Sequence, residues 1–253
     1  MSRYISPVLY ILLMLVGCAA FISIAGVRVG LFEPITGFSL LRQSVFASLA
    51  LSAFAALSMF FCRKECNVSS QRFFGLVLTV SLVYSLMWIV FYVERCNLPQ
   101  INDISTDTVS PPLFINATFL RKSNQNSLDY NPKVAAIQKA NYPEVKPVFT
   151  DKDIKLAYQK TLKLIQDKGW QLNGSYPEVG IIEATARTPI FGFRDDVVLR
   201  VAMVDGKVRI DMRSCSRVGT GDFGMNAKRI VNFMTDLEFS LNSRPMDRVH
   251  YLK

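Results

Sequence analysis

Three long apolar runs dominate the first part of the chain. Residues 7–27 and 73–93 contain no charged side chain, and residues 38–62 contain one, Arg42. At a rise of 1.5 Å per residue, a helix of each length crosses the hydrocarbon core of a bilayer. A single run of this kind also fits a buried helix, but three before residue 96 favour membrane spans. We therefore expect a three-helix transmembrane region over residues 1–96.

The second expected span carries small side chains at every fourth position, namely Ser44, Ser48, Ser52 and Ala56. This spacing places them on one helical face, and flat faces let helix backbones approach closely within lipid. We expect this face to pack against the first or third span. A membrane-protein partner or a second copy of the chain is the alternative.

The pattern changes after residue 96. Residues 97–128 are polar and rich in Ser, Thr, Asn and Pro, and further prolines follow at 132, 143 and 147. Such composition is typical of loops. We expect an extended linker over residues 97–149 and a soluble domain over residues 150–253.

The soluble domain shows helical periodicity at both ends and strand patterns between them. Asp205-Gly206 is a two-residue hairpin turn, which sets Arg200 opposite Asp211 and places the apolar residues of both strands on one face. The pattern predicts a two-layer α+β sandwich in which two helices cover one face of an antiparallel sheet of about four strands. The expected helices are 151–168 and 225–242, and the expected strands are 170–173, 180–187, 197–204 and 207–214.

The charge distribution changes the set of expected partners. The chain has 29 basic and 20 acidic side chains, and residues 97–253 carry a net charge of +5. The basic residues form no run and no nucleic-acid-binding motif, so we expect no nucleic-acid partner. A mildly cationic domain tethered to a bilayer is expected to meet membrane lipid.

Two cysteine features bear on processing and metals. The stretch 15–18, ending at Cys18, resembles a lipoprotein cleavage site, but apolar sequence continues beyond it, so an uncleaved span is our main interpretation. Cys62 and Cys66 lack further ligands in the sequence, and the one histidine is His250. We expect no metal site and no cofactor.

The polar segment between the hairpin and the last helix is the candidate ligand site. Its glycines, hydroxyls and arginines precede a helix N-terminus, where free N–H groups bind anions. Asp222 can cap that helix instead, so a structural loop is our first interpretation of this segment and a binding site is the alternative. The candidate ligand-binding residues, including the charged face of the hairpin, are Asp196, Arg200, Asp211, Arg213, Ser214, Ser216, Arg217, Gly219, Asp222 and Asn226.

The same segment carries a family resemblance. The stretches 192–197, 213–219 and 222–230 read GFRDDV, RSCSRVG and DFGMNAKRI, and with residues 104–114 they resemble domain-of-unknown-function family 1499 over about residues 97–242. Ala227 departs from the pattern, since many members have a basic residue there. The resemblance implies an exported or membrane-associated domain and no established activity.

Two functions fit these observations. The first is a membrane-anchored, non-enzymatic module of the bacterial inner membrane, whose periplasmic domain binds a partner protein or an anionic lipid-like ligand. Four basic residues on the expected inner side against three on the outer side favour a cytoplasmic N-terminus. The second is an envelope hydrolase or transferase using Asp195 or Asp196 with Asp222. We expect no catalytic residue set.

Overall fold

The computed structural model describes residues 2–63 and 67–243, so Cys66 and His250 lie outside the described residues. The chain divides into two compact units, which are treated separately. The first comprises Met1–Asn97 with Thr188–Gly192, and the second comprises Leu98–Arg187 with Phe193–Lys253.

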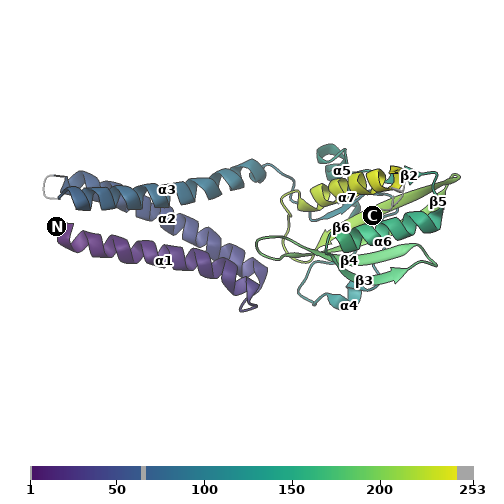
Figure 1. Cartoon of the computed structure of the whole chain (residues 1–253), viewed down its shortest axis with the longest axis horizontal. Coiled ribbons are helices and arrows are strands. Elements are labelled where there is room, and N and C mark those ends of the chain that lie inside the picture. Colours follow the sequence, from purple (N-terminus) through teal and green to yellow (C-terminus); the bar gives the residue numbers. More distant parts are fainter. Residues whose placement is uncertain (1, 64–66, 244–253) are drawn as a thin grey trace, which may run out of the picture. The chain divides into compact units, whose positions relative to one another are not determined.

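Three long helices form the first unit: α1 Ser2–Arg28, α2 Pro34–Cys62 and α3 Val68–Cys96. Their most apolar windows have mean hydropathies of 2.6, 2.1 and 2.2. Each helix extends beyond the run expected from the sequence and is long enough to span a membrane. A multi-pass membrane protein is therefore the architecture that these helices indicate (Figure 1).

The small residues of α2 face α3. The Ser48 hydroxyl donates to the carbonyl of Ser81 at 2.9 Å, and the Ser85 hydroxyl donates to the carbonyl of Val45 at 3.2 Å. Ser44 Oγ lies 2.7 Å from the Tyr84 hydroxyl. Ser52 is also buried, whereas Ala56 is partly exposed. Small side chains thus bring the two backbones together, with hydroxyls satisfying groups that lipid cannot.

The second unit is an α+β domain built on one antiparallel sheet, with strand order β1-β6-β5-β4-β3 and β2 also paired to β6. Its strands are β1 Asp103–Ser105, β2 Val148–Thr150, β3 Gln171–Tyr176, β4 Ile181–Arg187, β5 Arg194–Val204 and β6 Lys207–Ser216. Its helices are α4 Ala117–Leu120, α5 Pro132–Asn141, α6 Ile154–Asp167 and α7 Met225–Asn242.

The register of the β5–β6 hairpin is the one predicted from its turn. Val204 pairs with Lys207, Leu199 with Met212 and Arg200 with Asp211. The sheet has six strands rather than about four, because β1 and β2 both lie along β6. These strands have three residues each, too few to show the alternation by which strands are recognised in a sequence.

The apolar face of the sheet carries the helical layer, in which α6 and α7 are long helices (Figure 1). Leu199, Ile210 and Met212 are fully buried in one cluster with residues of both helices. In that cluster the Trp170 ring stacks on Phe233 of α7 with a centroid distance of 5.2 Å. The predicted α+β domain with two helices on one sheet face is confirmed.

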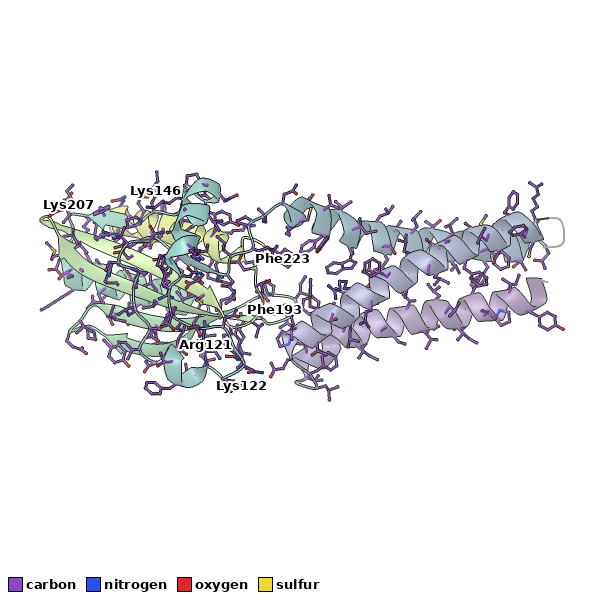
Figure 2. All side chains as sticks on the ribbon, turned by 180° about the vertical axis from the view of Figure 1, so that it is seen from behind. Arg121, Lys122, Lys146, Phe193, Lys207 and Phe223 are labelled. Carbon is purple, nitrogen blue, oxygen red and sulfur yellow. The ribbon has the colours of Figure 1, made fainter. Side chains whose placement is uncertain are left out.

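Residues 97–149 differ from the extended linker that we expected. From Leu98 onward they belong to the compact domain, where they supply two strands and two helices. The segment between β1 and α5 covers the polar face of the sheet, and Arg121 follows α4 directly within it (Figure 2). Polar composition misled the prediction here, because this segment is held by buried ion pairs rather than by apolar burial.

Candidate functional site

Arg213, at the centre of the predicted ligand site, is fully buried and has internal partners. Its Nε and Nη2 atoms donate to both carboxylate oxygens of Asp103 at 3.0 and 2.7 Å. Further donors reach the carbonyls of Pro112 and Leu128. The guanidinium also lies 5.0 Å from the ring centroid of Phe114. These contacts fix the arginine against the segment that covers the sheet.

Asp196 forms a second buried centre on the same face. It accepts hydrogen bonds from Arg217 Nη2 at 2.8 Å, from Arg121 Nε at 2.8 Å and from the Thr185 hydroxyl at 3.0 Å. Asp196 is fully buried and Arg217 is 6% exposed. A buried carboxylate between two guanidiniums is matched in charge and hydrogen bonding, as burial of a charge requires.

Arg200 and Asp211 form a third cluster with Asp107 and Arg209, nearer the hairpin tip. Arg200 Nη2 lies 2.9 Å from Asp211 and 3.0 Å from Asp107, and Arg209 Nη2 lies 2.8 Å from Asp211. The arginine side chains are about one quarter exposed. This cluster is thus the part of the predicted charged face that solvent reaches.

Ser214, Ser216 and Asn226 meet on the opposite face, toward α7. The Ser214 hydroxyl donates to Asn226 Oδ1 at 2.7 Å, and Asn226 Nδ2 donates to Ser216 Oγ at 2.9 Å. Arg229 donates to Asn226 and forms an ion pair with Asp195. Asp195 and Asp196 therefore point to opposite faces, as their adjacent positions in a strand require.

Gly219 and Asp222 shape the glycine-rich loop. The carbonyl of Gly219 accepts hydrogen bonds from the amides of Asn102 and Asn126. Asp222 accepts from the N–H groups of Gly224 and Asn226 at 2.9 and 2.7 Å, so it caps α7. Burial raises the pKa of the Asp222 carboxyl to about 6, although both N–H donors act to lower it. The carboxylate of Asp222 thus occupies two N–H donors at the start of α7.

The ten predicted residues thus form several interlocked clusters instead of one open cradle. Ligand binding by them stays a prediction, and Arg200 is the charged member with the greatest side-chain exposure. Cys215 is buried beside them, and burial, followed by the charge of Asp103, raises the pKa of its thiol to about 12. A thiol of this kind stays protonated at neutral pH and is a poor nucleophile.

Among the polar residues that sequence reasoning missed are Asp103 and Glu183, which are buried, and Arg121, whose side chain is 6% exposed. Glu183 is fully buried and accepts hydrogen bonds from the N–H groups of Ile115, Asn116 and Ala117 at the start of α4. Asp103 and Arg121 lie in the segment taken as a linker. The family resemblance beginning near residue 97 was the signal that could have marked this segment as part of the domain.

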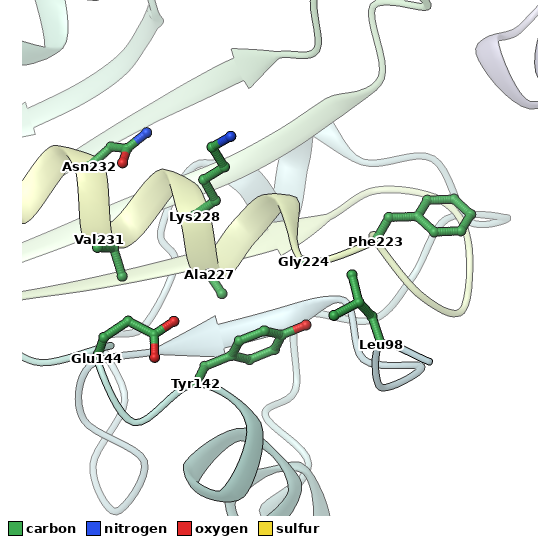
Figure 3. Close-up of a pocket in the computed structure, with 9 residues that line it drawn as sticks. All are labelled: Leu98, Tyr142, Glu144, Phe223, Gly224, Ala227, Lys228, Val231 and Asn232. Atoms are coloured by element: carbon green, nitrogen blue, oxygen red, sulfur yellow. The ribbon is translucent and has the colours of Figure 1, made fainter. Parts of the chain in front are cut away.

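A pocket of about 280 Å³ opens beside the start of α7 (Figure 3). It lies between the first turns of α7 and the chain that joins α5 to β2. Tyr142 is 8% exposed, and its hydroxyl is buried without a hydrogen-bond partner among the described residues. The lining residues are Leu98, Tyr142, Glu144, Phe223, Gly224, Ala227, Lys228, Val231 and Asn232.

Comparison with known proteins identifies the domain but no activity. A search of curated proteins found no match. Residues 103–237, more than half of the chain, match the model of a family described as a protein of unknown function, DUF1499. This range includes both buried arginine centres, the glycine-rich loop and most of α7. The chain therefore belongs to the DUF1499 family.

Proposed function

We propose that the protein is a membrane-anchored, non-enzymatic binding module of the bacterial inner membrane, with its α+β domain on the periplasmic side. The three long apolar helices supply the anchor. The domain binds a membrane lipid or a lipid-like molecule at the pocket beside α7, where polar groups are available. A membrane-protein partner is the other ligand class that the sequence favours.

One contrast carries this proposal. Asp103, Asp195 and Asp196 are each engaged by a buried arginine. By comparison, Lys228 and Glu144 line the pocket and form no ion pair within the described part of the chain. Groups already paired internally stabilise the fold, whereas the exposed charges of Lys228 and Glu144 remain available to a ligand that enters the pocket.

The alternative is an envelope hydrolase or transferase that uses Asp195 or Asp196 with Asp222. Asp222 favours it, because a carboxyl whose pKa is about 6 is suited to proton transfer near neutral pH. Against it, Asp222 is held by two backbone N–H groups of α7. Loss of biological complementation by Asp222→Asn, in a chain that still folds and still cross-links to lipid at the pocket, would support the enzyme over the binding module.

Cross-linking of the intact chain in its own membrane tests the binding module. Photoreactive lipid analogues are added to cells, and the chain is purified in mild detergent and analysed by mass spectrometry. We expect cross-links within residues 98 or 223–232 in the parent chain, reduced at least threefold by Lys228→Glu. Lys163→Glu, on the exposed surface of α6, is the matched control and should match the parent.

Two results would overturn the proposal. One is equal cross-linking of the parent and Lys228→Glu chains at these residues. The other is the absence of lipid cross-links in the domain, together with no protein that co-purifies with the parent chain and is lost from Lys228→Glu. Circular dichroism of both variants checks that the domain has folded.

A further inference from the structure

The pocket beside α7 has a size and a polarity that identify a class of ligand. Its volume of about 280 Å³ lies just below the range of about 300–1,000 Å³ typical of sites for drug-sized molecules. It therefore suits a small polar group with a short apolar stem, such as a lipid head group, rather than a whole acyl chain or a folded peptide.

The buried hydroxyl of Tyr142 is aimed into this pocket. Figure 3 shows its ring beneath the start of α7, with the hydroxyl directed toward Leu98 and Gly224. A Cβ atom at Gly224 would lie 3.3 Å from this hydroxyl, so the glycine leaves the space beside it open. A buried hydroxyl without a partner is unfavourable, and a ligand that supplies a donor or an acceptor removes that deficit.

Two carboxylates act on the hydroxyl of Tyr142. After burial, the charges of Asp222 and Glu144 raise the pKa of Tyr142. Asp222 also occupies the N–H groups of Gly224 and Asn226, which removes donors that an anion would use at the start of α7. The end of the pocket at Tyr142 and Glu144 therefore favours a cation that donates hydrogen bonds.

A positive group lines the pocket elsewhere. Lys228 lines the pocket from α7 and does not pair with Glu144. Figure 3 shows its side chain above α7, directed away from Glu144 below the helix. An extended ligand with an ammonium at one end and an anionic group at the other complements both. Leu98, Ala227 and Val231 supply apolar walls for the carbon atoms between them.

The tether favours a lipid as the source of this ligand. Leu98 follows the last residue of α3, Cys96, by two positions. Two residues of extended chain reach at most about 7 Å, so this wall of the pocket is covalently held near the end of a candidate span. The lipid head-group region borders the hydrocarbon core that such a span crosses.

We infer that this pocket binds a phosphoethanolamine head group, with its ammonium at Tyr142 and Glu144 and its phosphodiester toward Lys228. The inference rests on the proposed function and names its ligand. It replaces the anionic head group expected from the sequence with a zwitterionic one. Phosphoethanolamine meets the requirement because its ammonium carries three N–H donors, whereas the quaternary ammonium of phosphocholine carries none.

Titration of the full chain in mild detergent tests the ligand class. The probes are dihexanoyl phosphatidylethanolamine, the matching choline and glycerol lipids, free O-phosphoethanolamine and a short lysine peptide. We expect the ethanolamine lipid to bind at least tenfold more tightly than the other two lipids. We also expect the ethanolamine lipid to bind more tightly than free phosphoethanolamine, because the lipid is a phosphodiester with an apolar stem. Binding is followed by calorimetry.

Variants connect that binding to the pocket. Glu144→Gln and Tyr142→Phe should each weaken binding of the ethanolamine lipid about tenfold, while Glu178→Gln, an exposed change in the β3–β4 turn, should leave it unchanged. Tyr142→Phe keeps the ring, and melting curves confirm folding of each variant. Glu144→Gln that binds like the parent would overturn the inference.

The remaining outcomes separate this inference from the proposed function. Preference for the glycerol lipid would overturn the ethanolamine assignment and retain a lipid-binding module. Tighter binding of the lysine peptide would assign the pocket to a protein partner and overturn the lipid inference. Preference for free phosphoethanolamine over its lipid would overturn the membrane source. Absence of binding by every probe would overturn this inference, while the cross-linking experiment decides the module itself.

Discussion

Arg217 and Asp196 form a buried ion pair in which Nε and Nη2 of the arginine both donate to the carboxylate, at distances between 2.8 and 3.2 Å. The residues are 21 positions apart, and Arg121 Nε donates to the same carboxylate at 2.8 Å. The pair joins β5 and the loop after β6 to the segment that follows α4. It thus connects elements that apolar packing alone does not hold.

Removing one partner of this pair should strongly destabilise the domain. Arg217→Ala leaves the Asp196 charge buried with Arg121 alone, and the free energy of unfolding should fall by about 3–5 kcal/mol. Denaturant unfolding of the full chain in detergent, followed by tryptophan fluorescence, measures the change. Lys163→Ala breaks an exposed pair with Asp167 and should change it by less than about 1 kcal/mol. Equal effects would contradict a structural role for the buried pair.

Asp222 should make stability depend on pH. Burial raises its pKa from 3.8 to about 6 in the folded chain, so the folded state binds more protons between these values. The contribution of the Asp222 carboxyl to the free energy of unfolding is therefore fully present below about pH 4 and is lost as pH rises through about 6. From pH 5 to pH 8 the parent should lose about 1.4 kcal/mol more stability than Asp222→Asn. Melting curves of both chains that shift in parallel would contradict the raised pKa.

Local rules explain the parts of the fold that the sequence predicted. The Asp205-Gly206 turn determines the hairpin register, because a two-residue loop permits only one pairing of the two strands. The α7 bounds 225–242 agree with the apolar periodicity of that segment. β1 and β2 depend on pairing with β6 across long sequence separations, such as Ile104 with Ser214. No pattern within three residues specifies such a pairing.

The candidate site was predicted less completely for the same reason. The sequence placed Asp196 on a charged face with Arg200 and Arg213, but its partners are Arg217 and Arg121. Arg213 pairs with Asp103, which is 110 residues away. Alternation along a strand identifies the face of a side chain. It does not identify which distant segment covers that face, and the pocket at Tyr142 depends on three such segments.

Gly180 should tolerate no side chain. Its φ is +68°, and a Cβ atom there would lie 2.1 Å from the carbonyl oxygen of Val201, whose N–H donates to the Gly180 carbonyl. Gly180→Ala should therefore force the start of β4 away from β5 and lower the unfolding free energy by more than about 2 kcal/mol. Gly206 has a similar positive φ, with open space around it. Gly206→Ala should therefore lower the unfolding free energy by about 1–2 kcal/mol. Unfolding curves that rank the two variants in the reverse order would contradict this close approach.

The side of the membrane that the domain occupies is open to a direct measurement. If each candidate helix crosses the membrane once, the α+β domain and the start of α1 are on opposite sides, and the distribution of basic residues favours export of the domain. Cys215 is unsuitable as a reporter because it is buried. Glu178→Cys introduces an exposed thiol in the β3–β4 turn, and we expect a membrane-impermeant maleimide to label it in cells with a permeabilised outer membrane.

The parent chain is the control, because it measures labelling of the native exposed cysteines, Cys18 and Cys96. Labelling of Glu178→Cys above that background only after the inner membrane is lysed would place the domain in the cytoplasm and reverse the proposed orientation.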